Sequence, residues 1–276
     1  MALESSRRGF IVSAGVLGLA PLRGANTNSN AEDIRLGIAT YSLRGFQRDL
    51  AIRMIKELNV RFASVKEFHL PYRDTPEQLA AGRKQFDQAG IDVVSGGVIY
   101  LMKDDDADIR YYFDYAKTCG MPLITIMPTA QTMPRIERFA KEYNIKVAIH
   151  NHGPEDKNFP TPQSALRVVK DLDPRCGICI DAGHTVRAGA DVVESIGEAG
   201  PRLFDMHIKD LRSTAKGSDC PVGEGMMPIV DIFKELKKVN YTGTVSLEYE
   251  IEEDSPFTGM KASFAYMRGV LAGMRG

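Results

Sequence analysis

Several short apolar segments of this chain end in side chains that can bind a metal ion or move a proton. The clearest is 146–151, a β-branched and apolar run that leads into the sequence His150-Asn151-His152. Segments 177–181, 203–209 and 244–249 follow the same pattern. The ligand-type residues at the carboxyl ends of the four segments are His150, Asp181, His207 and Glu248. Because α/β barrels carry their chemistry at the carboxyl ends of buried strands, this pattern predicts one shared site.

The histidines support the same conclusion. The chain has five, and each falls at or just beyond the end of a predicted strand: His69, His150, His152, His184 and His207. We expect none of them to lie in a helix, and the neighbours Gly183 and Thr185 favour a loop around His184. Since chance would scatter histidines over helix surfaces, their clustering indicates a common functional site.

The four ligand-type residues are separated by 31, 26 and 41 residues, and each gap is about one strand–helix unit long. Two imidazoles and two carboxylates form a mixed nitrogen and oxygen donor set. Such a set suits one divalent ion, with Mn²⁺, Co²⁺, Zn²⁺, Fe²⁺ and Mg²⁺ as candidates. The alternative is a metal-free polar pocket, but four donors at matching depth on consecutive strands favour the metal site.

The elements that must position these residues alternate regularly from residue 34 onward. We predict eight strands, at 35–43, 62–68, 92–100, 122–127, 146–151, 177–181, 203–209 and 244–249. Helical periodicity predicts helices at 46–58, 75–89, 104–119, 134–143, 161–172, 191–199, 228–239 and 256–274. Eight such units favour an α/β fold of the closed (β/α)8 TIM barrel type, as a single domain over 34–276. A doubly wound sheet is the alternative, but it would need a glycine-rich turn where the chain has Thr40–Leu43.

Four motifs resemble the xylose-isomerase-like barrels of the sugar phosphate isomerase/epimerase superfamily. They read DAGH at 181–184, HIKD at 207–210, PVGEG at 221–225 and LEY at 247–249, and the resemblance extends from Ile34 to the carboxyl end. It implies that a Glu, an Asp, a His and a second Glu from strands five to eight hold one divalent metal. Asp181, His207 and Glu248 match that set, whereas His150 stands in place of the first Glu.

The resemblance also suggests catalytic residues. Lys66, in the sequence KEFHLP at 66–71, stands where the family's second strand carries a Glu. It is predicted to donate a proton or stabilise an oxyanion, or else to pair with Glu248 or Asp181 as a structural counter-charge. His184 matches a position beside the substrate and is expected to bind it or to act as an acid or base.

Four further residues complete the predicted site. His152 shares a strand face with His150, so it is predicted to act in catalysis or as a fifth ligand. Lys209 shares the face of His207 and is predicted to bind substrate, as are His69 and Glu224. The glycines around Glu224 either bring that loop to the barrel mouth or simply form a turn, and Asp210 is expected to orient a neighbour.

The reaction implied by the resemblance starts from a metal that polarises a sugar carbonyl and acidifies the adjacent C–H bond. The resulting enediolate leads to isomerisation, epimerisation, or β-elimination and its reverse, hydration. The family favours the first two. The sequences HNHG at 150–153 and KEFHLP resemble a branch of exported proteins acting on 3-keto sugars, for which a hydratase or lyase reaction on 3-keto-glycosides or 3-keto-glycals is expected. A non-catalytic sugar-binding barrel is a further alternative.

Composition narrows the class of partner. The formal net charge is -1 and no basic stripe is present, so we expect a small carbohydrate and not nucleic acid. Cys176 and Cys179 form a C-x-x-C pair, but residues three apart on a strand face opposite ways, so neither a redox nor a zinc role is expected. A homo-oligomer is compatible with the sequence.

The amino-terminal segment predicts export. Arg7 and Arg8 precede an apolar run at 11–22 and small residues near Ala25, so we interpret 1–25 as a twin-arginine signal peptide and 26–33 as a flexible leader. The apolar run is too short to remain as a membrane anchor, and no Cys follows it to carry a lipid. We therefore expect a periplasmic protein without a stable membrane anchor, and hence a non-phosphorylated sugar as its substrate.

Replacing Arg7 and Arg8 together by lysine should retain the precursor in the cytoplasm, because the twin-arginine route depends on that pair. Cell fractionation followed by immunoblotting measures the distribution. Unchanged export of the double variant would contradict the assignment.

Overall fold

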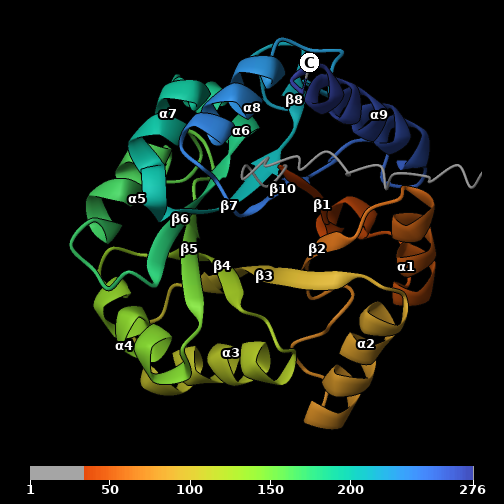
Figure 1. The fold of residues 1–276 in the computed structure, drawn as a ribbon. Coiled ribbons are helices and arrows are strands. Elements are labelled where there is room, and N and C mark those ends of the chain that lie inside the picture. Colours follow the sequence, from red (N-terminus) through yellow and green to blue (C-terminus); the bar gives the residue numbers. More distant parts are fainter. Residues whose placement is uncertain (1–33, 276) are drawn as a thin grey trace, which may run out of the picture. The chain divides into compact units, whose positions relative to one another are not determined.

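The computed structural model describes residues 34–275, which form the barrel domain in Figure 1. The predicted signal peptide at 1–25 and the predicted leader at 26–33 lie outside the described residues. None of the helices formed by residues 34–275 is both long enough and apolar enough to cross a bilayer.

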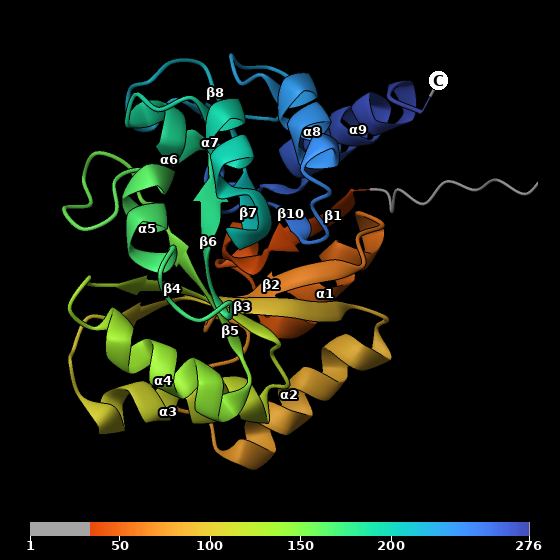
Figure 2. The same cartoon turned by 60° about the vertical axis from the view of Figure 1, so that its left-hand side comes forward.

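Within the described residues, eight parallel strands close into a barrel in the order β1-β2-β3-β4-β5-β6-β7-β10, as Figures 1 and 2 show. The strands are β1 (Arg35–Ala39), β2 (Phe62–Val65), β3 (Asp92–Leu101), β4 (Leu123–Pro128), β5 (Lys146–His150), β6 (Cys176–Asp181), β7 (Leu203–Ile208) and β10 (Thr244–Leu247). This confirms the predicted single-domain (β/α)8 TIM barrel.

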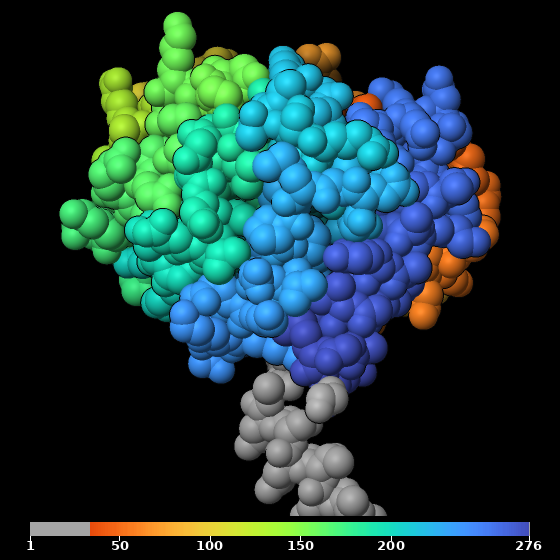
Figure 3. All heavy atoms as spheres, turned by 90° about the horizontal axis from the view of Figure 1, so that it is seen from above, coloured from red at the N-terminus to blue at the C-terminus, as the bar shows by residue number. Residues whose placement is uncertain are grey.

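Helices surround the barrel and, apart from α6, follow the predicted segments closely. They are α1 (Arg48–Glu57), α2 (Pro76–Gln88), α3 (Asp106–Thr118), α4 (Met133–Tyr143), α5 (Pro162–Val169), α6 (Ala182–Arg187), α7 (Val192–Ala199), α8 (Ile229–Lys238) and α9 (Phe257–Gly273). The starts of α2 and α5 could be predicted from the sequence because each begins with Thr followed by Pro. In the structure Thr75 and Thr161 form capping boxes. Helices α8 and α9 lie side by side on the surface seen in Figure 3.

The main core lies between the strands and the helices. Five helices each insert one fully buried phenylalanine into it: Phe86, Phe113, Phe139, Phe233 and Phe264. Because helices cover the outside and side chains fill the inside, the strands are buried on both faces and appear as continuous apolar runs. As predicted, Cys176 and Cys179 separate, with Cys176 in this core and Cys179 in a small apolar cluster with Leu123 and Ala148.

Three local features differ from the predictions. Strand β1 ends at Ala39, and Thr40–Leu43 forms the 3-10 helix η1 instead of continuing the strand. Strand β2 ends at Val65, and the backbone turns where His69 N donates to Lys66 O at 3.0 Å. The expectation that no histidine lies in a helix is wrong, because His184 lies in α6, which was expected to be a loop.

Asp210 organises the loop that follows β7. It begins the short hairpin of β8 (Asp210–Leu211) and β9 (Asp219–Cys220), which was not predicted. Its buried carboxylate accepts hydrogen bonds from backbone N–H groups of Leu211, Gly223, Gly225 and Met227, at 2.8, 2.9, 3.1 and 3.0 Å. Asp210 therefore orients the loop around Glu224, and its role in the described structure is to anchor backbone.

Asp210→Asn should lower the free energy of unfolding by roughly 2–4 kcal/mol, because a charged acceptor of several buried N–H groups is replaced by a neutral amide. Urea denaturation measures the change. Glu224→Gln is the matched control, since its ion pair with Arg212 is exposed and should contribute less than about 1 kcal/mol. Equal effects of the two substitutions would contradict the anchoring role.

Candidate metal centre

Four strand ends bring the predicted ligand residues together inside the barrel mouth. His150 ends β5, Asp181 ends β6, His207 lies near the end of β7, and Glu248 directly follows β10. Asp181 and His207 are also partners in the register of the parallel pair β6–β7. One ligand atom from each of the four residues lies within 4.8 Å of all the others, and none of the residues is more than 5% exposed.

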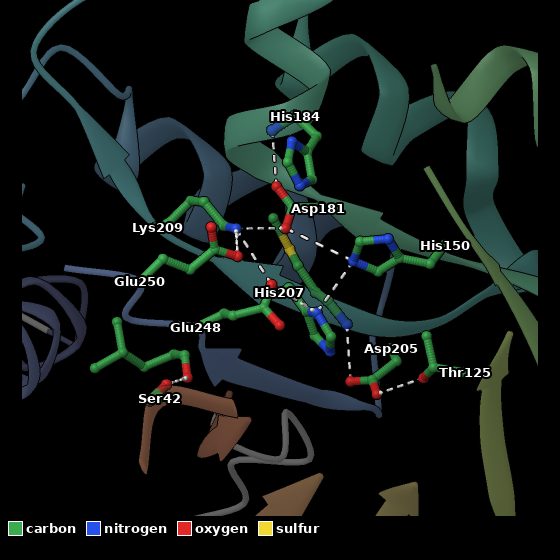
Figure 4. Close-up of polar contacts among 12 residues, drawn as sticks. Ser42, Thr125, His150, Asp181, His184, Asp205, His207, Lys209, Glu248 and Glu250 are labelled. Carbon is green, nitrogen blue, oxygen red and sulfur yellow. Dashed lines mark hydrogen bonds and ion pairs between the residues drawn. The ribbon is translucent and has the colours of Figure 1, made fainter. Parts of the chain in front are cut away.

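The distances between the donor atoms suit a single bound ion. His150 Nε2 lies 3.2 Å from His207 Nδ1 and 3.7 Å from Asp181 Oδ2, and His207 Nδ1 lies 3.3 Å from Glu248 Oε2. Two donors that each bind a tetrahedral ion at about 2.1 Å are about 3.4 Å apart. The observed spacing therefore fits a metal ion, and Figure 4 shows the side chains converging on one point.

Burial and charge prepare the donors for a cation. Burial lowers the pKa of His150 to about 4, so its imidazole is neutral near pH 7 and keeps a lone pair for an ion. Burial would raise the pKa of Asp181 and of Glu248, but His184 and Lys209 lower that of Asp181, and His207 and Lys209 lower that of Glu248. Both carboxylates are therefore ionised.

His207 and Asp181 each have a property that bears on ion binding. Burial works to lower the pKa of His207, yet the neighbouring Cys179 and Glu248 raise it well above its usual range, and ion binding would displace the proton so favoured. Asp181 Oδ2 is buried and, within residues 34–275, accepts no hydrogen bond, although it lies 3.1 Å from the Lys209 ammonium. The contact with Lys209 has ion-pair distance without hydrogen-bond geometry, so this oxygen retains lone-pair capacity for an ion.

A cavity of about 370 Å³ opens above these ligands. The predicted site residues that line it are Lys66, His150, His152, His184, Lys209 and Glu248. Lys66 is only 9% exposed, and its Nζ lies 5.1 Å from the centre of the Tyr41 ring, but among the described residues it has no carboxylate partner. The structural pairing considered for Lys66 is made instead by Lys209, whose Nζ contacts both Asp181 and Glu248.

His184 is held by a residue that the sequence reasoning missed. Arg187 Nη1 lies 3.2 Å from His184 Nδ1, and because a guanidinium only donates, Nδ1 must be the acceptor. Burial lowers the pKa of His184 to about 4, so the neutral ring carries its proton on Nε2. Arg187 also forms an ion pair with Glu155 and lines the cavity. Arg187 lies three residues after His184, so a predicted helix at α6 would have placed the two side chains next to each other.

Two predicted substrate contacts do not line this cavity. His69 is fully buried behind the β2 turn, where its Nε2 lies 3.2 Å from the carbonyl oxygen of Phe46. Glu224 is exposed and paired with Arg212, because Asp210 holds its loop away from the mouth. The third, Lys209, does line the cavity, but its ammonium is directed at carboxylates.

A larger cavity of about 750 Å³ lies at the opposite end of the barrel, among strand-starting residues such as Arg35, Lys146 and Thr244. None of the predicted site residues lines it. The chemistry therefore belongs to the smaller cavity at the carboxyl ends of the strands, as in other barrels of this type.

Comparison with known proteins agrees with this geometry. The sequence model of a family described as "Xylose isomerase-like TIM barrel" matches residues 52–270. An inosose dehydratase of Clostridium beijerinckii is 23% identical over 201 residues, which cover 65% of this chain and 64% of that protein. The curated relatives are matched over about two fifths to two thirds of their own length.

Solved structures show the same fold. A zinc-bound structure of the IolI protein superposes with a TM-score of 0.74 at 15% identity, over 87% of this chain and 99% of that one. A D-psicose 3-epimerase crystallised with D-fructose gives a TM-score of 0.67 at 18% identity, over 88% and 98% of the two chains.

Asp181→Ala and Glu248→Ala should each abolish stoichiometric metal binding while the protein stays folded, because each removes a donor from one closely spaced set. Elemental analysis of the purified variants measures the metal, and circular dichroism checks the fold. Glu224→Ala, which removes an exposed carboxylate, is the control. Full metal content in both site variants would show that the ion binds elsewhere.

Proposed function

The chain belongs to the xylose isomerase-like TIM barrel family, and from this premise we propose that it is a divalent-metal-dependent sugar isomerase or epimerase. Its substrate is a non-phosphorylated keto sugar that reacts through an enediolate. The observation that carries the proposal is the set of four buried donors, two of which line a cavity together with Lys66, His152 and His184. When bound, the ion supplies the Lewis acidity that polarises the sugar carbonyl.

Lys66 lines the cavity from the turn after β2, a strand that is adjacent to none of the strands that carry the ligands. A buried ammonium without a carboxylate partner favours an oxygen of the substrate, especially one that gains negative charge. Lys66 therefore donates a proton to, or stabilises, the oxygen that becomes anionic.

His184 and His152 are the candidates for hydrogen bonding to the substrate and for proton transfer near the ligands. The centroid of the His152 ring lies 4.5 Å from that of His184 and 5.8 Å from that of His150. With Nδ1 occupied by Arg187, His184 can offer only Nε2–H to a substrate hydroxyl or carbonyl, so it acts as a hydrogen-bond donor. His152 carries no such constraint and is the better candidate for the residue that removes and returns the proton.

A hydratase or lyase acting on 3-keto-glycosides or 3-keto-glycals is the second candidate. The similarity to an inosose dehydratase favours it, since that name denotes removal of water from a cyclic keto sugar alcohol. The same cavity groups would serve, with Lys66 protonating the departing hydroxyl or aglycone.

Incubating the metal-loaded protein with ketoses and 3-keto-glucosides in deuterated water, followed by NMR, distinguishes the candidates. An isomerase or epimerase should incorporate deuterium beside the carbonyl without other change in mass. A hydratase or lyase should add or remove water, or release an aglycone. Neither result with any keto sugar would favour a non-catalytic sugar-binding barrel.

Lys66→Met should reduce turnover roughly 10²–10⁴-fold and leave metal content unchanged, because a proton donor is lost while the ligands remain. Steady-state kinetics and elemental analysis measure the two quantities. Lys103→Met is the matched control, since Lys103 is exposed and pairs with Asp108 outside the cavity. Wild-type turnover in the Lys66 variant would exclude its catalytic role.

A further inference from the structure

Lys209 is surrounded by negative charge at the centre of the candidate site. Figure 4 shows its ammonium between the carboxylates of Asp181, Glu248 and Glu250. Its Nζ lies 3.1 Å from Asp181 Oδ2, 3.2 Å from Glu248 Oε2 and 2.9 Å from Glu250 Oε1. The residue is only 4% exposed. Two of its three N–H donors bond to Glu248 and Glu250, and its charge also pairs with Asp181, so the ammonium is directed at carboxylates and not at the cavity.

Two of the three carboxylate oxygens in contact with Lys209, Asp181 Oδ2 and Glu248 Oε2, belong to the ligand set. Asp181 Oδ2 is 3.7 Å from His150 Nε2, and Glu248 Oε2 is 3.3 Å from His207 Nδ1. An ion held by the four ligands would therefore share both carboxylates with the ammonium.

We propose that Lys209 is a built-in cation that shares Asp181 and Glu248 with the metal ion, holding the site together without metal and limiting how tightly metal binds. This inference rests on the proposed metal-dependent function. It assigns Lys209 a positioning role in place of the substrate contact predicted from the sequence.

The fold makes room for this lysine specifically. Lys209 directly follows β7 and lies two residues after His207, so the strand alternation continued by one residue directs both side chains to the mouth. The stem of Lys209 then passes against Gly183 at the start of α6, where an added Cβ would lie 2.6 Å from Lys209 Cγ and Cδ. A glycine at this place in the DAGH motif therefore leaves the path along which Lys209 reaches Asp181.

The charges around Lys209 explain how it would affect both the stability of the metal-free site and the binding of a metal ion. Asp181, Glu248 and Glu250 together carry three negative charges in the immediate surroundings of Lys209. The Lys209 ammonium offsets one of these charges. In the metal-free site the proton favoured on His207 offsets a second, and a divalent ion that displaces this proton would offset two. Because buried carboxylates without a counter-ion strongly destabilise a fold, Lys209 lets the metal-free protein keep the site assembled. The same positive charge repels an incoming cation.

Lys209→Met tests both consequences. Metal affinity is measured by competition between the protein and a fluorescent chelator for Zn²⁺ and for Mn²⁺. The variant should bind each ion more tightly, by roughly tenfold or more, because a neighbouring positive charge is gone. Its melting temperature in EDTA should fall by about 5 °C or more, and added metal should restore most of that loss.

Lys216→Met is the matched control. It removes the same charge from a residue that lines the same cavity, but Lys216 is exposed and makes no contact with Asp181 or Glu248 in the described structure. It should change metal affinity much less than Lys209→Met. An equal change in the two variants would mean that only the overall charge of the mouth matters, and would overturn the proposal.

A second variant covers the case in which Lys209→Met fails to fold. Glu250→Gln, at a partly exposed carboxylate, keeps Lys209 but removes one of its three partners. The ammonium should then draw closer to the shared oxygens, so metal affinity should fall severalfold, and by more than in Glu155→Gln, a charge removal elsewhere in the cavity. Equal effects of these two substitutions would count against the proposal.

The outcomes separate this inference from the proposed function. If wild-type protein binds no divalent ion, the metal-dependent function fails together with the inference. If the wild type binds metal but Lys209→Met binds it equally or more weakly, only the role assigned to Lys209 fails, because the ligand set and its chemistry remain.

Discussion

Closure of the barrel is the constraint on which the site depends. In a closed parallel sheet every strand points the same way, so the carboxyl ends of all the strands meet at one mouth. The ligand residues on β5, β6, β7 and after β10 are far apart in the chain, yet their donor atoms lie within 4.8 Å of one another. An open sheet would spread the same residues along an edge, where no single ion could reach all of them.

The convergence of the strand ends brings several carboxylates close together, and neighbouring cationic and imidazole side chains offset their negative charge. Two ligand carboxylates come together beside Glu250, at a depth where burial works to raise the pKa of Asp181 and of Glu248. Lys209 lies against all three, and the imidazoles of His150 and His207 lie at the other side of the same oxygens. Lys66, whose Nζ lies over the Tyr41 ring, has no carboxylate partner within residues 34–275, and this distinguishes it from Lys209.

Local sequence signals predicted most of the architecture but not its short connecting elements. The eight strands and the long helices carry strong periodicity and clear caps, such as Thr75 and Thr161, so their positions were recovered within a few residues. Helix α6 was missed because it has only six residues and contains Gly183 and Thr185, which are typical of loops. Its start depends on Asp181 Oδ1 accepting from His184 N at 2.7 Å, a bond that exists only when the strand end is in place.

The sequence by itself determined the fold class, the family resemblance and the four ligand-type residues, because each is encoded in residue types and spacing along one strand or motif. The roles of the remaining polar residues were decided by tertiary structure. Lys66 and Lys209 are both lysines near strand ends, but only Lys209 meets carboxylates, because β7 lies between β6 and β10 whereas β2 is adjacent to neither. His69 and Glu224 were equally plausible from sequence. The turn after β2 buries His69, and Asp210 holds the loop of Glu224 at the surface. Such contacts between segments distant in the chain produce no periodic pattern in the sequence.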